Sequence, residues 1–138
     1  MIAKKRKVEN RKTGKTDIQD DADIKKLVHR FYDKVGQDER LGYMFNDVAQ
    51  VNWKTHLPKM VNFWSNILFK TRRFKGRPYR KHRPLPIKRA DFNIWLGLWN
   101  ETVDHLYEGQ NADIVKEVAY RVACAFTTRL EMDNAFVD

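Results

Sequence analysis

Four helical patterns and the long basic segment that divides them constrain the fold of this chain more than any other feature. The basic segment runs from Lys70 to Arg89 and contains ten Lys or Arg, three of the four prolines and no Asp or Glu. It has neither helical nor strand periodicity. A connection of about 20 residues without regular structure is uncommon in a compact domain and usually has a function. Because so many cations repel one another, we expect this segment to face an anionic partner.

Apolar residues recur at helical spacing on both sides of the basic segment. These patterns run over residues 24–35, 53–68, 92–106 and 115–130, and they predict four helices. Pro58 restricts the second helix, which either begins near Thr55 or has bent first turns. Residues 37–52 are expected to form a short irregular connection. No strand pattern and no internal repeat are found, so the predicted fold class is all-α.

The net charge of +9 is distributed unevenly along the 138 residues. Residues 1–16 carry +6 and residues 70–89 carry +10, so the rest of the chain carries −7. An acidic helical body argues against a nucleic-acid-binding helix, which would have cations along one face. The length predicts one domain. We expect a disordered basic tail over residues 1–17, a folded domain over 18–132 and a frayed end over 133–138.

The single cysteine, Cys124, excludes an intramolecular disulfide and is typical of a reducing, cytoplasmic environment. Its apolar neighbours predict a buried thiol. No apolar run is long enough to span a membrane, and the basic N-terminus is not followed by the apolar stretch of a secretory signal. We therefore expect a cytoplasmic protein without a membrane partner.

The four histidines differ in their expected surroundings. His105 falls on the wet side of its helix and His29 at the border with solvent, whereas His56 lies on an apolar face and His82 in the basic segment. A lone histidine on an apolar face is more often a hydrogen-bonded core residue than a ligand. Tyr32 lies on the shoulder of its apolar stripe, which favours a tyrosine at the edge of the core with its hydroxyl in water.

Recognisable catalytic motifs are absent from the sequence. It has no HExxH, no paired cysteines, no glycine-rich phosphate loop and no GxSxG elbow. All four tryptophans are predicted to point inward, and they could fill an ordinary helical core or surround a flat apolar ligand. From periodicity alone, an all-α protein of unknown function ranks ahead of a protein with a prosthetic group.

Several strings of this chain resemble the group III truncated haemoglobins, in the order of that family and with similar spacing from about Ile18 to Leu130. The strings are FYDKV at 31–35, LGYMFN at 41–46, WKTH at 53–56, NFW at 62–64, RKHRPLP at 80–86 and IWLGLW at 94–99. The paired-glycine motifs of the other two groups are absent, since none of the six glycines is adjacent to another. The resemblance implies a two-over-two helical sandwich that encloses one haem b.

The resemblance also implies roles for particular residues. His82 would be the proximal ligand of the haem iron, in or beside a very short helix. Its second ring nitrogen needs an acceptor that fixes the ring, and a carbonyl near residues 77–79 could serve. The other implied positions are Phe45 on the porphyrin, Trp64 on the far wall, Tyr32, His56 and Trp95 on the distal side, and Arg77, Arg80 or Lys81 near the propionates.

Tyr32 and Trp95 could each donate a hydrogen bond to bound O2, whereas His56 could instead gate entry to the site. A hydrogen bond to a charged acceptor contributes roughly 1.5–3 kcal/mol, or about 10- to 150-fold in retention. Two such donors favour NO detoxification or redox chemistry, as an NO dioxygenase or a peroxidase-like protein, over bulk O2 transport. The expected partners of this monomer are O2, NO or CO and an unidentified reductase, without nucleic acid. The alternative is a cofactor-free helical module whose basic segment and tail bind acidic partners or RNA.

Overall fold

The computed structural model describes residues 14–76 and 78–138, and this part of the chain is helical without a strand, as predicted. No helix in it is long and apolar enough to cross a membrane. Residues 1–13 of the predicted tail lie outside the described residues. The elements are α1 (Asp21–Gln37), α2 (Glu39–Gly42), a π-helical turn η1 (Tyr43–Val48), α3 (Trp53–Phe69), α4 (Pro78–His82), α5 (Arg89–Leu106) and α6 (Gln110–Met132).

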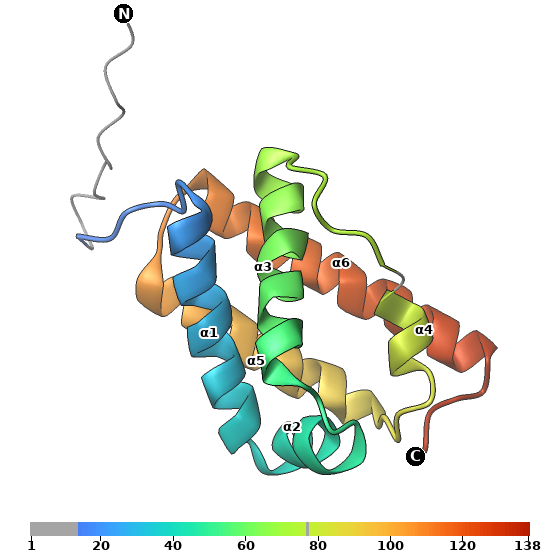
Figure 1. The fold of residues 1–138 in the computed structure, drawn as a ribbon. Helices are drawn as coiled ribbons and strands as arrows, with labels where there is room; N and C mark the ends of the chain where they lie inside the picture. Colours follow the sequence, from blue (N-terminus) through green and yellow to red (C-terminus); the bar gives the residue numbers. More distant parts are fainter. Residues whose placement is uncertain (1–13, 77) are drawn as a thin grey trace, which may run out of the picture.

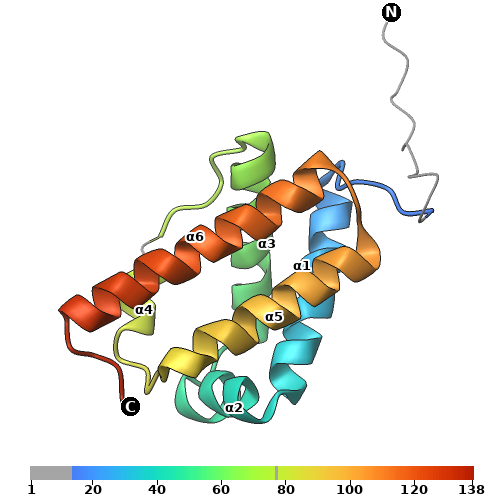
Figure 2. The ribbon, with the colours of Figure 1, turned by 180° about the vertical axis from the view of Figure 1, so that it is seen from behind.

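The four long helices form two crossed layers. Helices α1 and α3 lie side by side in the front layer of Figure 1, and α5 and α6 lie behind them. Figure 2 shows the same arrangement from behind, with α4 beside the C-terminal half of α6. Helix α1 packs on both α3 and α5, α3 also contacts α6, and α5 contacts α6. This is the two-over-two arrangement expected from the sequence.

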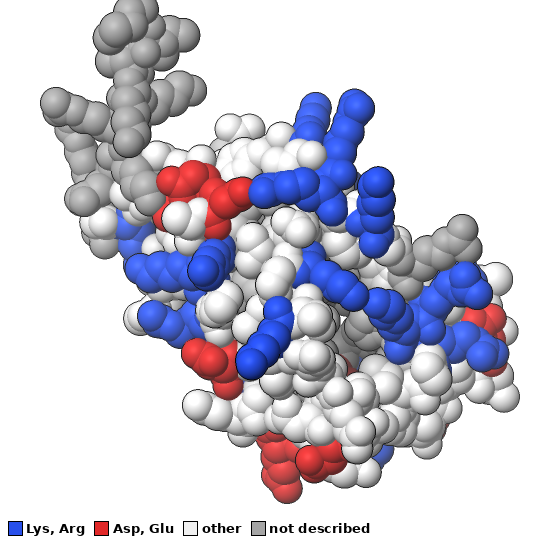
Figure 3. All heavy atoms as spheres, viewed as in Figure 1, with Lys and Arg blue, Asp and Glu red and all other residues white. Residues whose placement is uncertain are grey.

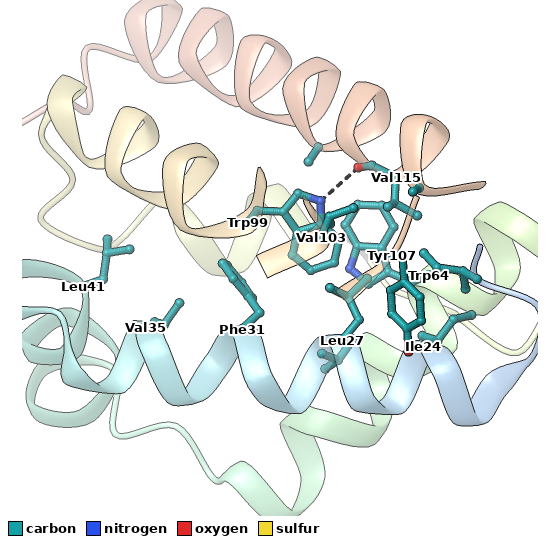
Figure 4. Packing of buried hydrophobic residues seen from close by; sticks show 14 of the residues in the cluster. Ile24, Leu27, Phe31, Val35, Leu41, Trp64, Trp99, Val103, Tyr107 and Val115 are labelled. Atoms are coloured by element: carbon teal, nitrogen blue, oxygen red, sulfur yellow. Dashed lines mark hydrogen bonds between the residues drawn. The ribbon is translucent and has the colours of Figure 1, made fainter. Parts of the chain in front are cut away.

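The core lies between the two layers, where the apolar stripes of the helices meet. Ile24, Leu27, Phe31 and Val35 of α1 are fully or almost fully buried. They lie opposite Trp99 and neighbouring residues of α5 (Figure 4). The buried Trp99 indole donates its N–H to the Val115 carbonyl of α6 at 3.1 Å, so a large apolar side chain is buried without leaving its donor unpaired.

The connection between α1 and α3 is helical, so the prediction of an irregular segment over residues 37–52 is wrong. The Asp38 carboxylate accepts the backbone N–H groups of Arg40 and Leu41 at 3.0 and 2.8 Å and begins α2 directly after α1. Helix α3 then begins at Trp53, before Thr55, and contains Pro58. Pro58 has no backbone N–H and so removes one helical hydrogen bond near the start of α3. The helix continues beyond it to Phe69.

The two ends of the described chain contact the helical body. Asp17, which we expected within the tail, accepts the backbone N–H groups of Asn111 and Ala112 at 2.9 Å and so satisfies the start of α6. At the other end we expected residues 133–138 to be frayed. Here the Val137 N–H donates to the Ile87 carbonyl at 3.0 Å, and Asp138 pairs with Arg89 at 3.2 Å.

Cys124 lies on the outer side of α6 and is exposed, so the prediction of a buried thiol is wrong. Its apolar neighbours in the sequence misled the prediction because they are distributed around the helix. Ala123 is buried, whereas Ala125 is exposed.

Candidate functional site

His82 ends the short helix α4 and is half-buried against α6. Its ring centroid lies 5.0 Å from that of Phe126. The Nδ1–H donates to the Pro78 carbonyl oxygen at 2.6 Å, one turn earlier, which is the acceptor expected near residues 77–79. Burial lowers the pKa of His82, and the bond to the carbonyl partly opposes this change. The ring is therefore neutral near pH 7, with its lone pair on Nε2.

His56 lies in the second turn of α3, and its Nε2 is buried without a hydrogen-bond partner among the described residues. Its pKa is lowered to about 4, first by burial and then by the charges of His82, Lys59 and Lys81. The ordinary core histidine that periodicity favoured would have a partner for each buried nitrogen. A buried polar atom without a partner is costly, and a molecule bound beside His56 would satisfy this nitrogen.

Three aromatic side chains surround His56 and form a cluster with it, which we call the aromatic cluster. Its members are Tyr32 of α1, Phe45 of η1, and Trp53 and His56 of α3. The Tyr32 ring centroid lies 5.2 Å from His56 and 5.4 Å from Trp53, and the Phe45 ring stacks on Trp53 at 5.9 Å. Burial also raises the pKa of the Tyr32 phenol, so this residue stays protonated and can donate a hydrogen bond.

Trp53 was not among the predicted site residues. The signal that could have identified it is its spacing of three residues from His56, which places both side chains on one face of a helix. Its indole N–H donates to the Asn46 side-chain oxygen at 3.0 Å and so joins the start of α3 to η1. The Trp53 rings therefore pack in the aromatic cluster, while its indole N–H holds the segment between α1 and α3 against the start of α3.

The other two tryptophans assigned to the site lie elsewhere in the aromatic packing. Trp95 contacts Phe31 with a centroid distance of 6.1 Å, and Phe31 in turn contacts Tyr32 at 4.8 Å. Trp64 is buried and stacks on Trp99 at 4.5 Å, within the main core. The structure thus brings Trp95 next to the aromatic cluster through Phe31, whereas Trp64 packs against the interior of the two layers.

The cations assigned to the site lie on or beside α4. Arg80 and Lys81 are exposed on this helix, and Arg77 lies outside the described residues. Neither Arg80 nor Lys81 has a carboxylate partner in the part of the chain that the structure describes. Arg83, by contrast, pairs with Asp133 at 3.2 Å. Two positive side chains next to His82 are therefore available to an anionic group.

A two-over-two helical sandwich with one histidine on α3 and another on α4 is the arrangement of the truncated globin class. Comparison with known proteins gives the same result. Residues 17–127 match the family model of the bacterial-like globins. The chain belongs to this family, and to group III of the truncated haemoglobins within it.

Two relatives support this assignment. The group 3 truncated hemoglobin ctb of Campylobacter jejuni is 33% identical over 111 residues, which are 78% of this chain and 87% of the relative. The crystal structure of the group III truncated hemoglobin from Campylobacter jejuni superposes with a TM-score of 0.77 at 32% identity. That comparison covers 84% of this chain and 94% of the solved chain.

Membership in the globin family makes this a haem protein of the gas-binding class. The family match spans the four long helices. A cofactor-free helical module, the alternative reading of the sequence, does not agree with this membership.

Proposed function

We propose that the protein holds one haem b through His82 and reversibly binds O2, NO and CO at the haem iron. The observation that carries this proposal is the pairing of His82. Its Nδ1–H donates to the Pro78 carbonyl at 2.6 Å, so the ring is neutral, has a fixed orientation and keeps its Nε2 lone pair for a metal. Neutral imidazole is the form in which histidine ligates haem iron.

The surroundings of His56 also fit one wall of a haem pocket. His56 has a buried Nε2 without a partner in the described chain, and the apolar rings of Phe45 and Trp53 lie next to it. Apolar rings exclude water, and a ligand that accepts or donates a hydrogen bond would satisfy the orphaned nitrogen. Phe45 and Trp53 would therefore keep the site dry, while His56 gates entry or contacts the ligand.

The haem would supply the iron that binds diatomic ligands and exchanges single electrons. Around it, this chain would supply hydrogen-bond donors, namely the phenol O–H of Tyr32 and the indole N–H of Trp95. Arg80 and Lys81, with Arg77, are the candidate partners of the two propionates, because guanidinium and ammonium groups form charge-assisted hydrogen bonds with carboxylates.

Two donors on the distal side would slow the release of O2. Slow release suits a protein that consumes its ligand, so we infer a role in NO detoxification or redox chemistry rather than in bulk O2 transport. Such a role requires a reductase that restores the ferrous iron. We further propose that the protein is a monomer that acts in the cytoplasm.

Visible spectra of protein expressed with haem test this proposal. The ferrous wild-type protein should have a Soret band that shifts sharply when CO is added. His82→Ala should lose most of its haem during purification, because the axial ligand is gone. His105→Ala is the matched control, since His105 is exposed on α5, and it should retain haem normally. Equal haem content in the two variants would reject His82 as the ligand.

A further inference from the structure

One face of the molecule is strongly basic. From Val48 to Ala90 the chain contains twelve Lys or Arg and no Asp or Glu. Folding places much of this stretch on the side of the molecule shown in Figure 3, over α3, residues 70–76 and α4. On this side blue side chains extend across the upper and right parts of the molecule and also along its left side, while red ones are fewer and lie at the upper left and at the lower and right edges.

Most of these cations have no carboxylate partner in the described chain. Arg73 pairs with Asp21 at 2.5 Å and Arg83 pairs with Asp133 at 3.2 Å. Eight others are exposed and have no ion pair with any described residue. Lys88 lies beyond α4, and we call the remaining seven the basic face: Lys54, Lys59, Lys70, Arg72, Lys75, Arg80 and Lys81. Like charges held together without counterions are unfavourable, and they attract an anionic surface over a distance of about 10 Å at moderate salt.

The basic face adjoins both histidines of the site. Lys59 follows His56 by three residues on α3, and Lys81 precedes His82 on α4. The charges of both lysines reach His56, where they disfavour the protonated imidazole. The two propionates of a haem would neutralise only two of the seven cations. An excess of positive charge therefore remains beside the proposed haem site.

The composition of the face favours an acidic protein over RNA or a membrane. Single-stranded RNA is bound largely by stacking on aromatic side chains, and peripheral membrane proteins insert apolar ones. The exposed large hydrophobic residues of the described chain are Tyr43, Val48, Tyr120, Met132 and Val137. Val48 lies at the first position of the basic stretch, and none of the five belongs to α3, residues 70–76 or α4, which carry the basic face. The face offers charge without exposed aromatic or apolar anchors.

We propose that the basic face docks an acidic electron-donor protein that carries a flavin or an iron–sulfur cluster. This inference depends on the proposed haem function. In each encounter one electron passes from the reduced donor to ferric iron, so the donor loses one electron, the iron becomes ferrous and no proton is transferred. Complementary charge accelerates such an encounter and makes it sensitive to salt, and a small interface would keep it transient.

The experiment measures reduction of the ferric holoprotein by stopped-flow absorbance, with a purified acidic flavodoxin in its reduced form as the donor. Lys59→Glu/Lys75→Glu removes four units of charge from the basic face without altering a residue assigned to haem. Lys25→Glu/Lys26→Glu makes the same change in net charge at exposed positions of α1 and is the matched control. At low salt the rate of iron reduction in Lys59→Glu/Lys75→Glu should be at least about tenfold lower than in wild type, and the rate in the control variant should be within about twofold of wild type. At high salt the rates of all three proteins should become similar.

Three further measurements separate the possible outcomes. Photoreduced deazariboflavin, an uncharged donor, should reduce all three proteins equally, and their Soret bands should match. If the wild-type protein has no Soret band, the proposed function itself fails. If haem is present but both double variants react alike with flavodoxin, the docking proposal is overturned. It is also overturned if Lys59→Glu/Lys75→Glu loses binding to single-stranded RNA or anionic vesicles yet keeps the wild-type flavodoxin rate.

Discussion

His82 Nδ1 and the Pro78 carbonyl oxygen lie 2.6 Å apart at the two ends of α4. This contact uses a main-chain atom, so substitutions of neighbouring side chains do not remove it directly. A single turn of helix thereby holds the imidazole in a defined orientation, which is a requirement for an axial ligand.

Removing this imidazole should have an effect that free imidazole reverses. In His82→Gly the proposed axial ligand is absent, so we expect the purified protein to contain little haem. Millimolar imidazole added with haem should restore a Soret band, because the small ligand can occupy the vacated space. Absorbance titrations with and without imidazole check this, and full haem retention without imidazole would contradict it.

Tyr32→Phe should accelerate the release of O2. The substitution removes the phenol O–H and leaves the ring to pack in the aromatic cluster. We expect the dissociation rate to rise by about 10- to 150-fold, the value of one hydrogen bond to a charged acceptor. Stopped-flow replacement of O2 by CO measures this rate. Tyr43→Phe, at a side chain that is 49% exposed, should leave the rate unchanged, and equal rates in both variants would remove Tyr32 as a donor.

Burial of His56 should make the stability of the haem-free protein depend on pH. Its pKa is about 4 in the folded chain and 6.5 in the unfolded chain, so the unfolded state binds more protons between these values. The contribution of neutral His56 to the free energy of unfolding is thus complete above about pH 6.5 and is lost as the pH falls toward 4. Because His56 is partly exposed, we expect the free energy of unfolding to fall by roughly 1–2 kcal/mol.

Urea unfolding at pH 7.5 and pH 4.5 measures this loss, with His56→Gln as the control. The variant cannot titrate at this position, so the fall in its free energy of unfolding should be smaller than in wild type. An equal fall in both proteins would show that His56 does not contribute.

Two ion pairs should differ strongly in their effect on stability. Asp91 is buried, pairs with Arg40 at 3.1 Å and accepts the Lys88 backbone N–H at 2.8 Å. Asp91→Asn leaves a largely buried guanidinium without its counterion, and we expect a loss of about 3 kcal/mol. Glu117→Gln breaks the exposed pair with Arg121 and should cost less than about 0.5 kcal/mol. Chemical denaturation measures the free energy of unfolding of both variants. Similar losses of stability in the two variants would contradict the prediction that the buried pair matters more than the exposed one.

The helices and one individual contact could be predicted from the sequence. The stripe from Ile24 to Val35 is buried as its spacing requires, and the acceptor of His82 lies within the three residues proposed for it. The prediction failed where local signals conflicted with tertiary structure. Residues 37–52 lack a clear period, yet Asp38 caps a helix there. Cys124 has apolar neighbours in sequence, yet it lies on the outer face of α6.

By itself the sequence determined the fold class and the chemistry that is available. Apolar periodicity decides which face of each helix is buried, and the matching strings identify the family. Only the tertiary structure decided which side chains meet. Trp53 joins Tyr32, Phe45 and His56, whereas Trp64 stacks on Trp99 in the core. The physical reason is that periodicity fixes the direction of a side chain relative to its own helix, while contacts between helices depend on their crossing and on the connections between them.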